Sequence, residues 1–319
     1  MRCAHGARKW GSASSWRELG VALVTIGVPV FNGENYLDEA LASIHRQTFT
    51  DFVVHISDNG SSDRTSDIAR SWAAKDPRFI YERLDENIGA SGNFNRLIAG
   101  CTTPYFRWHA HDDVMQTDLL QACVYELQRN ESLIGCTTQV QFIGPDGGPL
   151  EAKLVGISLT QLSPSQRLGH FLLKHSRCDA IFGLYRTEVL RKTAQIPPYR
   201  GGDQVTLCEL AILGPRLELA RPLLSLREHG ARSMRAHVSS DELTKWFDPR
   251  SNLKIGSILV HLLRQKLAMV NGQDLSFFQK ICCKLLLYWW FLRQSVVWPA
   301  KSWIKGALVR MGPEPGGAI

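Results

Sequence analysis

The sequence lacks the marks of several common protein classes. Its eight cysteines form no Cys-x-x-Cys pair, so neither a zinc site nor a disulfide framework is expected, and reduced thiols favour the cytoplasm. Residues 1–20 hold no apolar core and do not form a secretory signal, so we expect a disordered leader there. A chain of 319 residues is long enough to bury a substantial core in one or two domains.

The basic residues are concentrated at the C-terminal end. From Ser251 onward, nine basic residues stand against two acidic ones, which equals the whole net charge of +7. Residues 284–303 (KLLLYWWFLRQSVVWPAKSW) interleave Lys and Arg with Trp, Tyr and Leu. This mixture is typical of a helix lying in a membrane interface, so we expect an anionic lipid surface rather than nucleic acid as partner.

Two interpretations of this tail stay open. One is a peripheral contact of residues 281–303 with the inner face of the membrane, and the other is a helix packed on the protein's own body. The longest uncharged run between 284 and 303 is Leu285–Leu292, eight residues. A bilayer span needs about 20 residues, so a membrane-crossing helix is not expected here.

Short apolar runs and helix-period segments alternate between residues 21 and 130. Residues 21–30 (VALVTIGVPV), 51–57, 78–83 and 104–110 have the pattern of strands, and the first two predict strands buried on both faces. The segments between and after these runs carry helical patterns. This alternation predicts βαβ units and an α/β fold with a mostly parallel sheet.

A polar cluster follows each of the four expected strands. These clusters are NGEN, DNGSSD, ENIGASGN and HDD, in chain order. Because parallel sheets bind ligands at the carboxyl ends of their strands, the four loops are expected to meet at one site. Beyond residue 150 the pattern is less regular, and we expect the main domain to end near Arg235, with a helical extension over 236–319.

Asp112 and Asp113 are adjacent carboxylates at the end of the fourth expected strand. An isolated pair is commonly a surface group beside a helix start. HAHDD also matches the opening of a binuclear metallohydrolase run, although Val114 stands where the last histidine is needed. The third interpretation is a divalent cation, Mg²⁺ or Mn²⁺, since hard oxygen ligands suit these ions and the cation removes the repulsion between the carboxylates.

The ordered set VPVFNGENYLDEALASIHRQTFTDFVVHISDNGSSDRT, NIGASGNFN and YFRWHAHDD resembles the family 2 glycosyltransferases of the GT-A fold, over about residues 21–235. The resemblance implies a Rossmann-like, mostly parallel sheet in a GT-A domain. It also implies a metal-dependent inverting transferase that moves a sugar from a nucleotide-diphosphate sugar to an acceptor hydroxyl. The Gln-x-x-Arg-Trp signature of processive synthases is absent, which favours addition of a single sugar.

The resemblance assigns nucleotide contacts to the first two loops. Pro29, Phe31 and Asn32 resemble the loop that borders the nucleotide base. Asp58, in SDNGSSD, matches the carboxylate that accepts a hydrogen bond from the base. No Gly-rich phosphate cradle or Walker lysine is present, so the cation is expected to neutralise the diphosphate.

The resemblance assigns the remaining donor contacts to the third and fourth loops. Asn87 and Asn93 lie in the loop that covers the nucleotide. Asp112 matches the residue that reaches the ribose, and Asp113 matches the metal ligand.

An inverting displacement also needs a general base. In the family this carboxylate opens a late helix, commonly as Glu-Asp, and GGDQVTLCELAILG offers Asp203 with Gly202 in place of the Glu. A plain helix-capping role for Asp203 stays open. Arg186 could face the acceptor or pair with a carboxylate, and His229, in REHGARS, could lie near the metal or be an ordinary loop histidine.

A second function stays open: a sugar-nucleotide-binding, membrane-associated partner protein without catalysis, favoured by the missing Glu at Gly202. A GT-A-like nucleotidylyltransferase ranks last, because its first loop would need the basic residues that VPVFNGENY lacks. The acceptor is unknown; a cell-surface polysaccharide or a glycoconjugate fits an enzyme at the inner face of the membrane.

Overall fold

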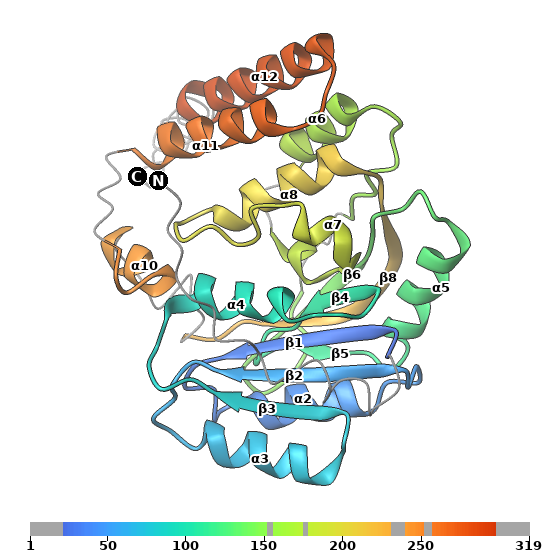
Figure 1. Cartoon of the computed structure of the whole chain (residues 1–319), viewed down its shortest axis with the longest axis vertical. Helices are drawn as coiled ribbons and strands as arrows, with labels where there is room; N and C mark the ends of the chain where they lie inside the picture. Colours follow the sequence, from blue (N-terminus) through green and yellow to red (C-terminus); the bar gives the residue numbers. More distant parts are fainter. Residues whose placement is uncertain (1–21, 152–155, 175–177, 231–239, 252–256, 298–319) are drawn as a thin grey trace, which may run out of the picture.

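A computed structural model describes residues 22–151, 156–174, 178–230, 240–251 and 257–297 (Figure 1). The expected leader over 1–20 and the end of the expected membrane segment, 298–303, lie outside these residues.

The first half of the molecule alternates strands and helices as the sequence predicts. Its elements are β1 (Val24–Val30), α2 (Leu37–His45), β2 (Phe52–Asp58), α3 (Thr65–Lys75), β3 (Phe79–Arg83), α4 (Gly89–Ala99) and β4 (Tyr105–Trp108). Strand β1 runs parallel to β2 and β4, and β2 runs parallel to β3. All seven residues of β1 and of β2 are buried, which confirms that both strands are covered on both faces.

The second half completes one eight-stranded sheet in the order β3-β2-β1-β4-β7-β6-β8-β5. Its elements are β5 (Val114–Met115), α5 (Leu119–Arg129), β6 (Gly135–Ile143), α6 (Pro164–Lys174), η1 (Asp179–Phe182), β7 (Leu184–Arg186), α7 (Thr187–Arg191), α8 (Gly202–Leu213) and β8 (Arg216–Arg227). Strand β7 is antiparallel to β4 and β6, and β5 is antiparallel to β8, so the sheet is mixed in this half.

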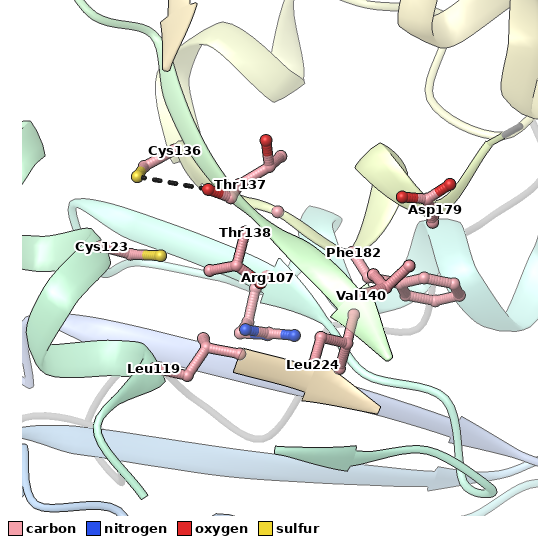
Figure 2. A pocket seen from close by; sticks show the side chains of 11 residues that line it. Arg107, Leu119, Cys123, Cys136, Thr137, Thr138, Val140, Asp179, Phe182 and Leu224 are labelled. Carbon is pink, nitrogen blue, oxygen red and sulfur yellow. Dashed lines mark hydrogen bonds between the residues drawn. The ribbon is translucent and has the colours of Figure 1, made fainter. Parts of the chain in front are cut away.

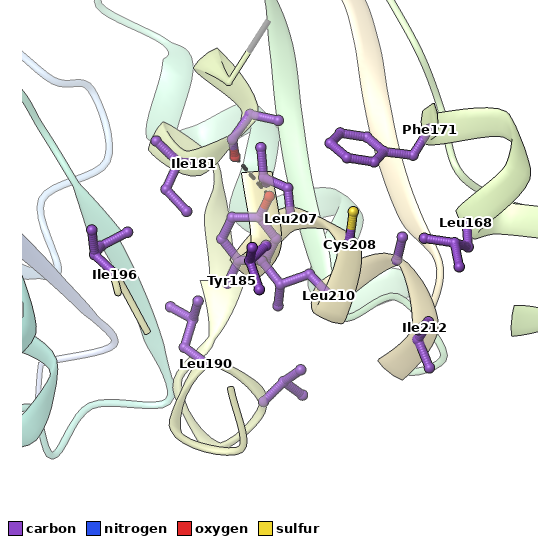
Figure 3. Close-up of a cluster of buried hydrophobic side chains, with 14 of the residues drawn as sticks. Leu168, Phe171, Ile181, Tyr185, Leu190, Ile196, Leu207, Cys208, Leu210 and Ile212 are labelled. Atoms are coloured by element: carbon purple, nitrogen blue, oxygen red, sulfur yellow. Dashed lines mark hydrogen bonds between the residues drawn. The ribbon is translucent and has the colours of Figure 1, made fainter. Parts of the chain in front are cut away.

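Two buried apolar clusters pack on the two faces of the sheet. One joins β1 and β2 to α2, α3 and α5, and the other joins β4 to α4, α6, α8 and the C-terminal helices (Figures 1 and 3). Gly27, in β1, allows α4 to approach, because a Cβ there would lie 2.9 Å from Phe106 and 3.1 Å from Leu97.

The described part of the C-terminal extension is helical, as predicted. It contains α10 (Ser240–Phe247), α11 (Ile258–Gly272), α12 (Phe277–Leu292) and a π-helical turn, η2 (Arg293–Val297). Helix α12 packs on α6 and α11, and α11 packs on α8, so these helices share the buried cluster of the main body. The domain boundary at residue 235 stays a prediction. Within the described ranges, no helix is long and apolar enough to cross a bilayer.

Candidate active site at the strand ends

The loops after β1 and β2 are joined by hydrogen bonds at the carboxyl ends of these strands. The Asn32 N–H donates to Ser61 Oγ at 2.9 Å, and the Ser62 N–H donates to Asn32 Oδ1 at 2.9 Å. Asn32 itself lies in the left-handed region, with φ 50°. The preceding Phe31 is 43% exposed, whereas Pro29 is buried inside β1. Phe31 is therefore the predicted first-loop residue whose side chain is free to meet a ligand.

Asp58 ends β2 with a carboxylate that is 0% exposed. Its Oδ1 accepts the Ser61 N–H at 2.8 Å, and its Oδ2 accepts hydroxyls from Ser66 and Tyr81, both at 2.9 Å. The Arg83 guanidinium lies 3.7 Å from Oδ2. These contacts fix the loop after β2 and occupy the carboxylate that is predicted to meet the base.

The two predicted asparagines of the third loop hold the start of α4 against β2. Asn87 Oδ1 accepts from Asn59 Nδ2 and from the Gly89 N–H, both at 2.8 Å. Asn93 is buried; its Oδ1 accepts the Ser57 hydroxyl at 2.5 Å, and its Nδ2 donates to the Ser57 carbonyl at 2.9 Å. Both side chains thus fix the loop between β3 and α4.

The adjacent carboxylates after β4 have different surroundings. Asp113 is buried, and its Oδ1 accepts the Arg227 N–H at 3.0 Å. The Asp112 side chain is 13% exposed, and its Oδ2 lies 2.9 Å from His229 Nε2. Of the two carboxylates, Asp112 is thus the less buried one, and it contacts a second side chain of a metal-binding type, His229.

Histidine side chains around Asp112 favour its charged form. Burial disfavours the carboxylate, but the nearby His111 and the hydrogen bond with His229 outweigh this effect, so the pKa of Asp112 is lowered. The loop after β1 closes over the same place: the Tyr36 ring lies 4.9 Å from the His229 ring, and a Cβ on Gly33 would lie 2.6 Å from His111. An anionic carboxylate beside an imidazole is a donor pair that suits a divalent cation.

Arg227 holds this arrangement together, and the sequence analysis did not single it out. Its buried side chain donates from Nε to the Asp112 carbonyl at 3.0 Å and from Nη2 to Glu39 Oε2 at 2.5 Å. Its Nη1 donates to the carbonyls of Gly144 and Pro145. The signal was present, since Arg227 comes two residues before His229 at the end of an apolar strand, but a lone arginine there has no distinctive spacing.

Asp203 lies in the first turn of α8, as predicted. Its Oδ1 accepts the Gln204 N–H at 2.8 Å. Burial raises the pKa of Asp203, while contacts with Cys178 and Gln204 and the positive charge of Lys266 oppose that rise. The turn before α8 is tied to α4, where Asn95 Nδ2 donates to the Ile196 carbonyl at 3.0 Å and Ser91 donates to the Pro197 carbonyl at 3.1 Å.

Arg186 contacts backbone carbonyls in this structure, and a role toward the acceptor stays a prediction. It pairs with Tyr105 at the start of β4, the opposite end of that strand from Asp112. Its guanidinium donates to the carbonyls of Leu133 and Leu127, both at 2.8 Å.

A small cavity lies in the core of the molecule, away from the loops described above. It lies beneath β4 and β6, with Arg107 pointing into it beside Cys123 and Leu224 (Figure 2), and its volume is ≈ 10 Å³. Such a volume admits about one water molecule, whereas small-molecule pockets measure about 300–1,000 Å³. Among the described residues, no group of three or more His, Cys, Asp or Glu side chains is placed to hold a metal ion.

The sequence is similar to those of known glycosyltransferases. The sequence profile described as Glycosyl transferase family 2 matches residues 25–193. The chain is 32% identical over 181 residues to an uncharacterized glycosyltransferase of Rickettsia typhi, a match that covers 51% of this chain and 53% of that protein. It is 27% identical over 240 residues to an uncharacterized glycosyltransferase of Nostoc sp., covering 73% of this chain and 72% of that one. The chain spans about half the length of the Rickettsia relative.

Solved structures resemble the fold. TarS of S. aureus superposes with a TM-score of 0.60 at 16% identity, covering 85% of this chain and 72% of that one. The mannosyltransferase PcManGT of Pyrobaculum calidifontis, solved with GDP-Man and Mn²⁺, gives 0.55 at 16% identity, covering 92% and 77%. At this identity the likeness concerns the fold, and it confirms the predicted GT-A architecture.

Proposed function

The chain belongs to glycosyl transferase family 2, and on that premise we propose that it is a metal-dependent inverting glycosyltransferase. It would move a single sugar from a nucleotide-diphosphate sugar to an acceptor hydroxyl. The observation that carries the proposal is the pairing of Asp112 with His229 at the carboxyl end of the sheet, 2.9 Å apart. The donor class is supported by neighbours of the same fold that were solved with UDP-GlcNAc and with GDP-Man.

Asp112 and His229 would hold the cation, Mg²⁺ or Mn²⁺. When bound, the cation stabilises the negative charge that develops on the departing diphosphate. The family resemblance assigns this ligand role to Asp113, and that assignment stays a prediction. The contact of Asp113 Oδ1 with the Arg227 N–H favours Asp112 as the ligand and a positioning role for Asp113.

Asp203 would act as the general base. The acceptor oxygen forms a bond to the anomeric carbon, the bond from that carbon to the β-phosphate oxygen breaks, and the hydroxyl proton passes to the Asp203 carboxylate. The nucleoside diphosphate leaves with the bonding electron pair, and attack on the opposite face inverts the anomeric centre. The raised pKa of Asp203 makes it a better proton acceptor than an ordinary surface aspartate.

The donor contacts follow the family assignment. Phe31 would border the base at the end of β1. Asp58, whose carboxylate is 0% exposed and already hydrogen-bonded, would contribute to the base site by holding the loop after β2 in place. Pro29, Asn32, Asn87 and Asn93 would shape the loops around the nucleotide, in keeping with their burial or their hydrogen bonds.

A panel of uridine, guanosine and thymidine diphosphate sugars tests the proposal. At least one member is expected to raise the melting temperature with Mn²⁺ present and to be hydrolysed slowly, and EDTA should remove both effects. Asp203→Asn should retain donor binding and lose turnover by at least about 100-fold, because a positioned base contributes that much. Failure of every donor to bind with metal would refute the assignment.

The alternative function, a non-catalytic sugar-nucleotide-binding partner protein, rests on Gly202 in place of the family's Glu. The same panel separates the two, since a binding protein would show the metal-dependent thermal shift without hydrolysis or transfer.

We further propose that α12 contacts the inner leaflet of the membrane, within the predicted segment 281–303. The inward face of α12 is formed by Cys283, Leu287 and Trp290. The outward face is apolar too, with exposed Phe277, Phe278, Leu285, Tyr288, Trp289 and Leu292. A helix that is apolar on both faces needs a second apolar surface to bury its outward face.

The charge of the helix favours anionic lipid as that surface. Residues 277–297 contain Lys280, Lys284 and Arg293 and no acidic residue. Figure 1 shows α12 at the end of the molecule farthest from α3, so its outer face is reachable by a flat surface. A cytoplasmic enzyme held this way would meet a glycan acceptor that is displayed on lipid.

Vesicle co-sedimentation tests this contact. The full chain is expected to pellet with phosphatidylglycerol-containing vesicles, and Leu285→Ser with Trp289→Ser should reduce the bound fraction severalfold. Tyr125→Ser, which changes an exposed tyrosine on α5, is the matched control. Equal pelleting of the double variant, or its self-association in place of lipid binding, would contradict a lipid-covered face.

A further inference from the structure

A lysine is completely buried where the C-terminal helices meet the start of α8. Lys266, in α11, is 0% exposed and belongs to the inward stripe of that helix with Leu262 and Val270. Its Nζ lies 3.3 Å from Gln204 Oε1 and 3.6 Å from the centre of the Trp290 ring in α12. One long hydrogen bond and one aromatic face are modest compensation for a buried ammonium.

The first turn of α8 brings Asp203 next to the group that this ammonium contacts, because the Gln204 N–H donates to Asp203 Oδ1 at 2.8 Å while Gln204 Oε1 lies 3.3 Å from Lys266 Nζ. The titratable groups that interact with the Lys266 ammonium are Cys178, before η1, and Asp203 and Cys208, both in α8. Burial lowers the pKa of Lys266, and these three groups oppose that effect. Burial raises the pKa of all three groups, and the Asp203 carboxyl, which has by far the lowest ordinary pKa of the three, is the one that most readily carries a negative charge.

We propose that Lys266 is a positioning residue for the transfer reaction, whose buried positive charge keeps Asp203 ionised and holds the first turn of α8 in place through Gln204. The inference rests on the proposed role of Asp203 as the base. On this proposal, helices α11 and α12 contribute to the active site, because Lys266 lies in α11 and Trp290, whose ring contacts the Lys266 ammonium, lies in α12.

The consequence is a specific dependence on pH. A buried carboxyl with a raised pKa is increasingly protonated as the pH falls, and a protonated Asp203 cannot accept the acceptor's proton. A nearby positive charge lowers the pKa of a carboxyl. Without Lys266, therefore, Asp203 is protonated at higher pH, and activity is lost first on the acidic side.

Metal-dependent hydrolysis of the donor found in the panel tests this inference, measured as kcat between pH 5.5 and 9. Lys266→Met, which keeps the volume and removes the charge, is expected to lose about tenfold in kcat at pH 6 and much less at pH 8.5, with KM unchanged. Lys266→Arg should restore the shape of the wild-type profile. Arg264→Met, an exposed position on the same helix, is the control and should match wild type.

The outcomes separate this inference from the proposed function. If no donor is hydrolysed by wild type, or Asp203→Asn hydrolyses at the wild-type rate, the proposed function is wrong. If those results stand but Lys266→Met lowers kcat equally at every pH, or not at all, Lys266 has no such role. Should Lys266→Met fail to fold by circular dichroism, Lys266→Gln, which also removes the charge, takes its place, and an unchanged pH profile there overturns the inference.

Discussion

Arg227 shows how one side chain fixes a site made of separate segments. Its guanidinium reaches the chain at Asp112, the turn at Gly144 and Pro145, and Glu39 in α2, while its backbone N–H holds Asp113. The ring of Tyr36 lies 4.5 Å from the guanidinium, on the loop that also contacts His229.

Replacing Arg227 with Met should lower the free energy of unfolding by about 3 kcal/mol, because buried carbonyls and Glu39 lose their donor. Arg227→Lys should recover little of this, since an ammonium cannot reach all four acceptors. Urea denaturation followed by tryptophan fluorescence measures both. A loss below about 1 kcal/mol for Met would show that Arg227 does not organise the site.

Substitution of the two neighbouring aspartates should have different effects, one on nucleotide binding and the other on stability. Asp112→Asn is expected to weaken Mn²⁺-dependent binding of a nucleoside diphosphate by at least about tenfold with little change in stability, because its carboxylate lies beside His229 and is the less buried of the two. Asp113→Asn should instead lower the melting temperature, because its buried carboxylate contacts the Arg227 N–H. If titration calorimetry shows that Asp113→Asn weakens nucleotide binding more than Asp112→Asn does, Asp113 is the ligand instead.

For single residues, the sequence predicted which residue types lie at the strand ends, but it did not predict which side chains contact one another. The order of motifs pointed to Asp58, Asp112 and Asp113 at strand ends, and the structure has them there. Neither the contact of His229 with Asp112 nor the contacts of Arg227 could be predicted, because they join residues that lie 82 to 188 positions apart and depend on the path of β8.

At the scale of elements, the pattern of apolar residues in the sequence predicted correctly those strands that are buried on both faces. The runs that predict β1 and β2 are continuous and apolar, and both strands lie inside the sheet. The strands of the second half were harder to predict, because β7 has three residues and β5 has two, which is too few to show a periodic pattern.

Gly27→Ala tests the packing of α4 on β1. The added Cβ would lie 2.9 Å from Phe106 and 3.1 Å from Leu97, so the helix must shift, and we expect a loss of about 1–3 kcal/mol in unfolding free energy. Gly272→Ala, at the end of α11 with no atom within 4 Å of the added Cβ, is the control and should be neutral or slightly stabilising. Equal stability of both variants would contradict the close approach.

At the scale of the whole molecule, buried histidines make stability depend on pH. Burial and the charge of Arg96 lower the pKa of His55 from 6.5 to about 4. Between these values the unfolded chain binds a proton that the folded chain does not, so stability is full above pH 6.5 and falls as the pH drops toward 4.

His55 alone should remove about 1.4 kcal/mol per pH unit below 6.5, or about 2 kcal/mol by pH 5. Melting temperatures at pH 7.5 and pH 5 measure this loss. His55→Gln should show a clearly smaller drop between the two pH values, and an identical drop would remove His55 as a cause.

The central claim is that Asp112 and His229 bind a divalent cation together with the diphosphate of a nucleotide. Isothermal titration calorimetry of the full chain with UDP, GDP and dTDP, each with Mn²⁺ and with EDTA, tests it most directly. The account predicts that at least one nucleotide binds with Mn²⁺, that EDTA abolishes the heat, and that Asp112→Asn and His229→Ala each weaken the binding. No binding of any nucleotide with Mn²⁺, or binding that is equally strong in EDTA, would contradict it.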